Sequence, residues 1–290
     1  MQHIALPLRV GDGAGGTVQV AGSVDVAVDL GDAEARGIHM SRLYLRLQDA
    51  LSVDALTFAG LRHVLQDCVD SQAGLSTRAR LLLRFEQLLR RRALASAHSG
   101  WKAYTGEVEA VLDAGADARL EVVLAFSVDY SSTCPASAAL SRQLNAERFA
   151  ADFAAGPSPA TATVADWLAS PRGLAATPHA QRSRAEVRAW LVPPAAETGG
   201  EDLPVVAFID AIESALATPV QTAVKREDEQ AFTRLNAENL MFCEDAARRV
   251  AAALAVDPRV ARFEAKVAHF ESLHAHDAVA RVSGAGAGAA

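Results

Sequence analysis

The order of elements predicted from the sequence favours an α+β fold, in which an antiparallel sheet carries helices on one face. Long stretches with alternating apolar side chains, typical of strands, come before paired helical stretches, and this order occurs twice. The sequence also shows no glycine-rich phosphate loop and no alternation of single strands with single helices. A doubly wound nucleotide-binding fold is therefore disfavoured.

In the first half of the chain, residues 16–30 alternate valines with polar residues and predict one or two strands, broken near Gly22. Residues 53–71 have the apolar spacing of a helix. Three long strands are then predicted at 77–89, 98–113 and 118–132, although residues 81–95 also suit a helix.

In the second half, the predicted elements are helices at 138–153 and 162–169, a strand at 184–192, a loop at 193–204, helices at 205–217 and 238–254, and a strand at 259–273 whose alternation slips near its end. We expect a first unit at 1–115 and a second at 116–282, which carries most of the candidate site residues. The low-complexity tail, 283–290, is expected to be disordered.

The net charge of −7 argues against a general nucleic-acid binder, but a local basic cluster could still bind a phosphorylated small molecule. The three cysteines form an odd set without the spacing of a disulfide framework, which fits a reducing compartment. The start, MQHIALPLRV, lacks the features of a signal peptide, and no stretch approaches the ~18 apolar residues of a membrane span. A cytoplasmic location is expected.

Cys134 is the first of several polar residues that a hydrophobic core would not require. A lone cysteine is usually a small buried hydrophobe. Cys134, however, lies in a loop after a strand, between three hydroxyl residues and Pro135. Hydroxyl groups and backbone donors favour the thiolate, which is the form that binds metals. Cys68 and Cys243 lie on apolar stripes of predicted helices, so we expect them in the core.

Two histidine-containing segments are candidates for chemistry. His179 lies in TPHAQRS, in a loop fixed by proline, and histidine is the side chain most often used for general acid–base work. Glu271 and His274, in FESLHAHDA, are three residues apart and would face opposite sides of a regular strand. To share a metal they need a turn or a break in the strand. The alternative for this segment is a solvated polar strand end.

Further carboxylates occur in KREDE and MFCED. Glu229 ends the first of these words, and Glu227 and Asp228 are interpreted as part of a solvated charged face. Glu244 lies on a predicted helix, where the alternative is a surface position paired with Arg248.

Six words in this sequence resemble those of the type IB GTP cyclohydrolases, which are enzymes of the tunnelling fold. They are RGIHMSR, YSSTCP, TPHAQRS, QTAVKREDEQ, NLMFCEDAARR and FESLHAHDA, in a resemblance that spans residues 36 to 282. Six words in order are more specific than any single motif. The resemblance implies two tandem tunnelling-fold (T-fold) units per chain, whose antiparallel sheets join into an oligomeric barrel. It also implies a homo-oligomer, expected to be a tetramer.

The resemblance assigns roles to the candidate residues. One divalent metal, either zinc, manganese or Fe(II), is expected on Cys134, Glu229, Glu271 and His274. His276 is expected to support the site.

By the same resemblance, His179 moves protons and Glu244 binds guanine. Glu244 would accept hydrogen bonds from the ring amide and the exocyclic amine of the base. The expected contacts to the triphosphate are the basic side chains His39, Arg42, Arg182, Lys225 and Arg226.

One departure from the family pattern concerns Cys-Pro-Cys, in which Ala136 replaces the second cysteine. We expect activity to survive, because thiol, imidazole and carboxylate donors are still present. The implied reaction converts GTP and water to 7,8-dihydroneopterin triphosphate and formate, the first step toward tetrahydrofolate. The alternatives are an archaeal-type cyclohydrolase with a cyclic phosphate product, and a non-catalytic purine- or metal-binding paralogue.

Overall fold

The computed structural model describes residues 1–72, 74–115, 118–156, 158–194 and 202–289. In these residues, eight strands form one sheet in the order of the sequence, and every neighbouring pair is antiparallel. The strands are β1 (Ile4–Gly11), β2 (Thr17–Val28), β3 (Arg78–Arg92), β4 (Ser99–Asp113), β5 (Arg119–Thr133), β6 (Ala180–Leu191), β7 (Val260–His269) and β8 (Ala278–Ala285).

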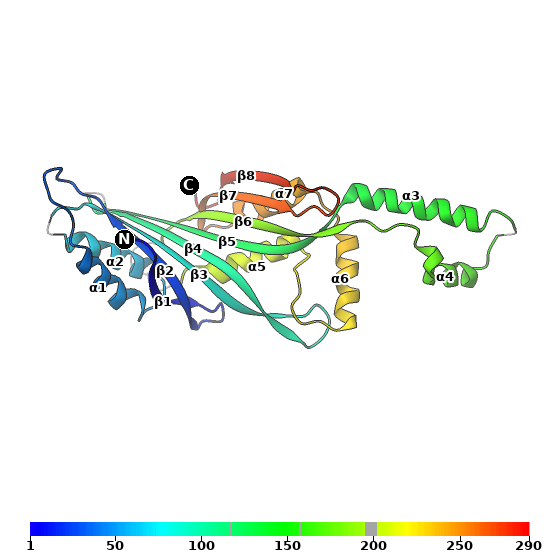
Figure 1. Cartoon of the computed structure of the whole chain (residues 1–290), viewed down its shortest axis with the longest axis horizontal. Helices are drawn as coiled ribbons and strands as arrows, with labels where there is room; N and C mark the ends of the chain where they lie inside the picture. Colours follow the sequence, from blue (N-terminus) through cyan, green and yellow to red (C-terminus); the bar gives the residue numbers. More distant parts are fainter. Residues whose placement is uncertain (73, 116–117, 157, 195–201, 290) are drawn as a thin grey trace.

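In the described residues, the helices lie in three of the connections between strands, β2–β3, β5–β6 and β6–β7 (Figure 1). They are α1 (Met40–Leu51), α2 (Phe58–Asp70), α3 (Pro135–Asp152), α4 (Thr161–Ala169), α5 (Val205–Leu216), α6 (Arg226–Glu238) and α7 (Cys243–Ala255), with a short 3-10 helix, η1 (Pro171–Gly173). None of the helices in the described ranges is long and apolar enough to cross a membrane.

The prediction of tandem T-fold units whose sheets form an oligomeric barrel was wrong. The chain builds a single open sheet with β1 and β8 at its edges (Figure 1). β4 and β5 pair from Gly106↔Phe126 to Asp113↔Arg119, so the second half of the chain extends the sheet of the first. The alternation of side chains predicts strands and faces, but it does not encode closure of a sheet.

One face of the sheet is apolar and is covered by helices. Leu81 and Leu83 of β3, Val108 of β4 and Leu124 of β5 are fully buried on this face. α1 packs on β1, α2 on β3 and β4, α5 on β5, and α7 on β7 and β8. The hydrophobic core therefore lies between the sheet and one layer of helices, as the period-two burial of the strands requires.

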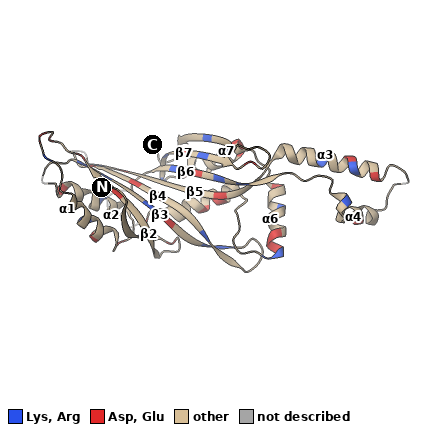
Figure 2. Cartoon of the chain, in the orientation of Figure 1, with Lys and Arg blue, Asp and Glu red and all other residues tan. Residues whose placement is uncertain are grey.

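The opposite face of the sheet is open and polar. Charged residues of both signs occur along the strands (Figure 2). Arg84 joins Asp25 and Glu107 on the two neighbouring strands, and Arg184 pairs with Asp129 at 2.7 Å. Arg84, Glu107 and Arg184 line a groove of about 1100 Å³ that extends from β2 to β8. The ion pairs thus take the place that hydrophobic packing has on the covered face.

The three strands predicted at 77–89, 98–113 and 118–132 are confirmed, so residues 81–95 do not form a helix. β1, α1, α6 and β8 were not predicted, and the helix expected at 238–254 begins at Cys243. β8 includes Ser283 to Ala285, the first residues of the predicted tail. The predicted loop at 193–204 and the unit boundary at 115/116 fall largely on residues outside the described ranges.

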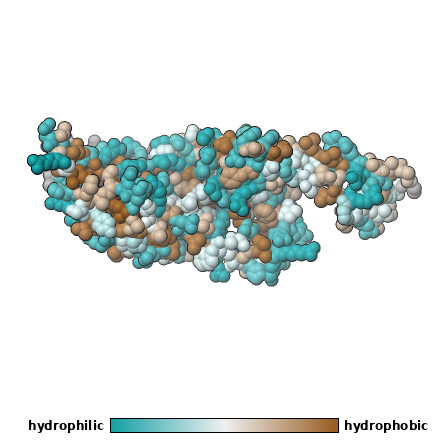
Figure 3. Space-filling view, in the orientation of Figure 1, coloured by the Kyte–Doolittle hydropathy of each residue, from teal (hydrophilic) through white to brown (hydrophobic). Residues whose placement is uncertain are grey.

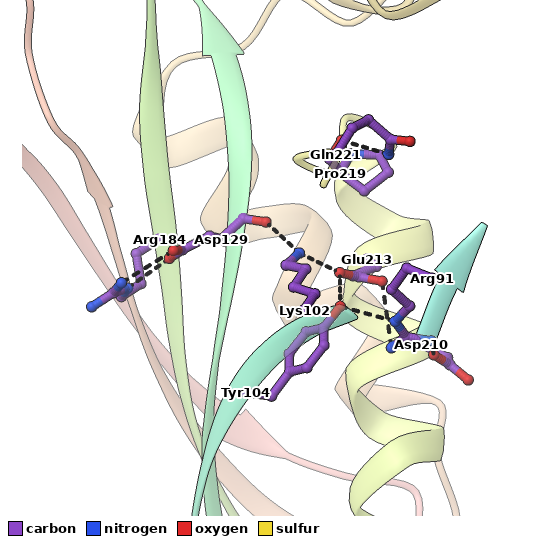
Figure 4. Close-up of polar contacts among 9 residues, drawn as sticks. All are labelled: Arg91, Lys102, Tyr104, Asp129, Arg184, Asp210, Glu213, Pro219 and Gln221. Carbon is purple, nitrogen blue, oxygen red and sulfur yellow. Dashed lines mark hydrogen bonds and ion pairs between the residues drawn. The ribbon is translucent and has the colours of Figure 1, made fainter. Parts of the chain in front are cut away.

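A buried polar network fixes α5 to β3 and β4 (Figure 4). Glu213 of α5 accepts hydrogen bonds from the Tyr104 hydroxyl at 2.6 Å and from Lys102 Nζ at 2.7 Å. Arg91 Nε donates to the Tyr104 hydroxyl at 2.9 Å, and Arg91 also pairs with Asp210. Burial, assisted by Glu213, raises the pKa of Tyr104, so the phenol keeps its proton and donates it to the carboxylate.

A second polar pair is buried where β5 and β7 end. The Tyr130 hydroxyl and His269 Nε2 are 2.8 Å apart, and the two rings meet edge to face. Burial lowers the pKa of His269 to about 4, an effect that the nearby Glu244 carboxylate partly offsets. His269 is therefore neutral at physiological pH.

We predict that Tyr104→Phe destabilises the fold by about 1–3 kcal/mol, because it leaves the partly buried charges of Arg91 and Glu213 without their shared hydroxyl. Urea unfolding followed by circular dichroism measures the change. Tyr44→Phe, at an exposed phenol on α1, is the matched control. Equal stability of the two variants would contradict a structural role for the network.

We predict that His269 makes the fold less stable in mild acid. Its pKa in the folded chain is about 4, below the ordinary value of 6.5, so the unfolded chain binds a proton first as the pH falls. The stabilisation is complete above pH 6.5 and declines toward pH 4, by up to about 3 kcal/mol.

Unfolding free energies of wild type and His269→Gln between pH 4 and 7 measure this contribution, and the variant should lose that part of the pH dependence. His63→Gln is the control variant, because it removes a histidine from the exposed side of α2. Parallel pH profiles for wild type and His269→Gln would contradict the burial of a neutral imidazole.

Candidate functional site

The ends of β5, β6 and β7 meet at one corner of the sheet. The last pair of the β5–β6 ladder is Thr133↔Ala180, and Cys134 N continues it by donating to the His179 carbonyl at 3.3 Å. Beyond the end of β7, Phe270 N donates to the Arg182 carbonyl at 3.1 Å. We call this place, with Cys134, His179 and Glu271, the strand-end corner.

Side chains of the strand-end corner contact one another. His179 Nε2 lies 4.0 Å from Glu271 Oε2, and Gln181 Nε2 donates to Glu271 Oε1 at 3.3 Å. Ser137 Oγ accepts from His179 N at 3.0 Å, while Ser137 N points to Cys134 Sγ at 3.5 Å. Cys134 thereby caps the start of α3 and remains partly exposed.

Buried polar side chains lie beneath the corner. Ser132 and Ser183 share a hydrogen bond of 2.7 Å, next to the Tyr130–His269 pair. Ser131 Oγ donates to Asn236 Oδ1 of α6 at 2.7 Å. These contacts satisfy the polar groups internally, so the corner is fixed by hydrogen bonds as well as by packing.

Glu244 lies in the first turn of α7, and its side chain is exposed. Its own backbone N–H at the helix start and the Cys243 thiol hold the pKa of the Glu244 carboxyl below its usual range. The segment before α7 is attached to the corner, since Met241 N donates to the Thr133 carbonyl at 3.2 Å. Arg248 pairs with Asp245 at 2.6 Å. The alternative interpretation, in which Arg248 pairs with Glu244, is therefore wrong.

Glu229 lies in the first turn of α6 and is exposed, as are Lys225 and Arg226 beside it. The other end of α6 contacts the corner through Asn236. Seven residues separate Glu229 from Asn236, which corresponds to about 10 Å along the helix axis. The structure therefore does not bring Glu229 to Cys134.

The interpretation of Asp228 as a solvated side chain was wrong. Asp228 is fully buried and accepts hydrogen bonds from the backbone of Ala95, Ser96 and Lys225, each at 2.8 Å, and from Ser96 Oγ at 2.6 Å. These bonds hold the pKa of Asp228 well below its usual range despite burial. Within a charged run, one residue thus anchors the β3–β4 loop to α6.

His274 and His276 lie on the exposed loop between β7 and β8, with their rings stacked 5.1 Å apart. β7 ends at His269, so the break that Glu271 and His274 require is present. In the parts of the chain that the structure describes, no three His, Cys, Asp or Glu side chains are grouped closely enough to hold a metal ion. Of the four predicted metal ligands, only Cys134 and Glu271 share the corner.

α1 and α2 cover the opposite end of the sheet (Figure 1), and His39 and Arg42 belong to the start of α1. His39 N donates to Gln72 Oε1, and Arg42 Nη1 donates to the Ser71 carbonyl, both at 2.8 Å. One chain therefore does not bring these residues to the corner. Arg182 belongs to β6 beside the corner, with an exposed side chain.

Cys68 and Cys243 are buried, as predicted. Burial raises the pKa of the Cys68 thiol to about 12 and, together with Glu244, that of Cys243 to about 11, so both remain thiols. The sequence interpretation did not find Ser137, Gln181 or His269. The period of two along TPHAQRS, which sets Gln181 beside His179 on one face, is the signal that could have found Gln181.

The fold resembles two solved uricases. A uricase from Bacillus fastidious matches with a TM-score of 0.50 and 8% identity, over 98% of this chain and 92% of that chain. A hyper-thermostable AgUricase mutant matches with a TM-score of 0.50 and 9% identity, over 98% and 90%. At these identities the likeness concerns the fold alone.

The family model of type I GTP cyclohydrolase folE2 matches residues 1–280, nearly the whole chain. This match agrees with the enzyme class that the six sequence words predicted. The chain belongs to the type I GTP cyclohydrolase folE2 family and is a GTP cyclohydrolase I enzyme.

Proposed function

We propose that this chain is a type IB enzyme that converts GTP and water to 7,8-dihydroneopterin triphosphate and formate at the strand-end corner. The observation that carries the proposal is the convergence of Cys134, His179 and Glu271 in a chain of this family. A thiol, an imidazole and a carboxylate at one partly exposed place supply the donor and acid–base groups that opening of a purine ring requires.

Glu244 is proposed to bind the guanine base. Its lowered pKa keeps it a carboxylate, which can accept hydrogen bonds from both the ring amide and the exocyclic amine of guanine. Adenine has an acceptor where guanine has its ring N–H, so the same carboxylate disfavours adenine. The first turn of α7 is tied to the end of β5 through Met241, which keeps Glu244 beside the corner.

His179 is proposed to move protons at the five-membered ring of the base. Water adds to the ring carbon, its oxygen forms the new C–O bond, and the electron pair of the C=N bond moves to nitrogen, which takes a proton. Protonation of the leaving nitrogen by His179 then assists ring opening, and a second hydrolysis releases formate. Glu271 Oε2 lies 4.0 Å from His179 Nε2, and Gln181 Nε2 holds Glu271 in place through its hydrogen bond to Oε1.

A divalent metal, either zinc, manganese or Fe(II), is also proposed, with Cys134, Glu229, Glu271 and His274 as its candidate ligands. The described residues of one chain do not fit a complete site, because Glu229 and His274 are not grouped with the other two. A mixed thiolate, imidazole and carboxylate set has borderline softness, so its chemistry does not single out one of these ions.

The triphosphate is proposed to contact Arg182, Lys225 and Arg226, together with His39 and Arg42. His39 and Arg42 belong to α1, at the opposite end of the sheet, so they are proposed to come from another copy in a homo-oligomer. From the family resemblance, this oligomer is proposed to be a tetramer. A cytoplasmic location is proposed from the cysteine pattern.

The main alternative within the class is an archaeal-type enzyme with a cyclic phosphate product. The alternative outside catalysis is a purine- or metal-binding paralogue, suggested by Ala136. Ala136 is exposed in the first turn of α3, so the missing thiol leaves no gap in the core. Incubation with GTP, followed by assays for formate and for a fluorescent pterin with an intact triphosphate, separates the three.

We predict that wild type releases formate and carries one divalent metal per chain, and that Cys134→Ala loses both. Elemental analysis and the formate assay measure the two outcomes. Cys134→Ser is the matched variant, because a hydroxyl can still cap α3 while the soft metal donor is removed. Full metal occupancy in Cys134→Ala would contradict the assignment of this ligand.

We predict that Glu244→Gln weakens GTP binding about 10- to 100-fold while the metal content is unchanged. An amide accepts only one of the two guanine hydrogen bonds and places an N–H group against the other donor, at a cost of about 1–3 kcal/mol. Calorimetric titration with GTP measures the affinity. Glu121→Gln, at an exposed position near the start of β5, is the control, and equal affinities of both variants would exclude Glu244 as the guanine contact.

A further inference from the structure

A buried tyrosine and a buried histidine join two strands of the strand-end corner. Tyr130 on β5 and His269 on β7 flank Ser183 of β6 in the pairing register. Their side chains meet, with the Tyr130 hydroxyl 2.8 Å from His269 Nε2 and the ring centroids 5.8 Å apart. Tyr130 is fully buried, and His269 is only 3% exposed. One polar contact thus connects the two strands beyond whose ends Cys134 and Glu271 lie.

Hydrophobic packing does not account for this polar pair. The neighbouring row of the register, Val128↔Ala185↔Val267, is apolar and buried. An apolar pair in place of Tyr130 and His269 would avoid the cost of removing polar groups from water. A hydrogen bond, unlike an apolar contact, is directional and fixes the relative orientation of its two groups. What the polar pair adds is therefore a defined spacing between β5 and β7.

The first turn of α7, which carries Glu244, lies close to the same pair. α7 packs on β7, and the Cys243 thiol donates to Glu244 Oε2 at 3.3 Å. Burial lowers the pKa of His269, and the nearby Glu244 carboxylate offsets part of this effect. Burial, with a smaller contribution from Cys243, raises the pKa of Tyr130. The pair is therefore situated between the strand ends and the proposed guanine contact.

We propose that Tyr130 and His269 are positioning residues for the reaction. Their contact sets the distance between the groups at the strand ends and the carboxylate of Glu244. Glu271 is two residues beyond His269, and Cys134 is four residues beyond the tyrosine. A change in the spacing of β5 and β7 therefore displaces both side chains. The inference rests on the proposed function, because it concerns turnover of GTP at the corner.

A positioning role predicts a loss of rate without a loss of substrate affinity. Glu244 and the proposed phosphate contacts still bind GTP when the strand ends are displaced. Displacement of a reacting group by about 1 Å can lower the rate about 100-fold. The effect should therefore appear in kcat, while the Kd for GTP stays nearly unchanged.

The test makes the same substitution at two buried phenols. Tyr130→Phe removes the hydroxyl beneath the corner. Tyr104→Phe is the matched control, because it removes a buried, hydrogen-bonded hydroxyl from the network that fixes α5 to β3 and β4. Circular dichroism shows whether each variant is folded at the assay temperature. Formate release gives kcat and KM, and calorimetric titration gives the Kd for GTP.

His269 is varied in two ways. His269→Leu removes the partner of Tyr130, whereas His269→Gln retains a polar group that can restore the hydrogen bond. We expect Tyr130→Phe and His269→Leu to lower kcat about 10-fold, with the Kd for GTP changed less than about 2-fold. Tyr104→Phe and His269→Gln should keep kcat within about 3-fold of wild type. The Tyr130→Phe/His269→Leu double variant should lose no more than the slower single variant, since each substitution already breaks the contact.

Equal kcat values for Tyr130→Phe and Tyr104→Phe would overturn the proposal, and so would a double variant whose loss is the product of the two single losses. If His269→Leu does not fold, the two tyrosine variants, each of which lacks a single oxygen atom, still decide the outcome. Failure of wild type to release formate would refute the proposed function, and the positioning role with it. An active wild type with unchanged turnover in Tyr130→Phe would refute the positioning role alone.

Discussion

The pairing register of β5, β6 and β7 is the constraint on which the strand-end corner depends. Tyr130↔Ser183↔His269 form one row across the three strands, and Cys134, His179 and Glu271 lie just beyond it. A strand slip of one residue would move every side chain to the opposite face. The backbone hydrogen bond between Cys134 and His179 would then be lost, and Gln181 would no longer reach Glu271.

The buried polar row below the corner has a physical cost and a physical use. An unsatisfied hydroxyl or imidazole in the core is destabilising, but Ser132, Ser183, Tyr130 and His269 are bonded in pairs. Such pairs accept only one register, whereas apolar side chains would tolerate several. These hydrogen-bonded pairs therefore fix the positions of the strand ends, and the residues that are proposed to act on GTP follow immediately.

Local patterns in the sequence predicted what local physics determines. The alternation of apolar residues identified the three central strands, and the apolar stripes placed Cys68 and Cys243 in the core. Asp228 could not be predicted as buried, because its partners Ala95 and Ser96 are more than 130 residues away. The open sheet was missed for a similar reason: the pairing of β4 with β5 depends on contacts between strands and not on the pattern within either.

The same limit explains which site residues meet in one chain. Cys134, His179 and Glu271 are joined by strand pairing, which the structure determines directly. His39 and Arg42 are fixed to the far end of α2 by hydrogen bonds to Gln72 and Ser71, so no small movement within the chain could carry them along the sheet. Two of the five basic residues expected at the triphosphate, His39 and Arg42, thus lie far from the corner along the sheet, a separation that the sequence words could not indicate. At the end of the sheet that holds the corner, Leu140 and Leu144 of α3 are exposed, and Figure 3 shows an apolar surface there, so packing within the chain does not account for these side chains.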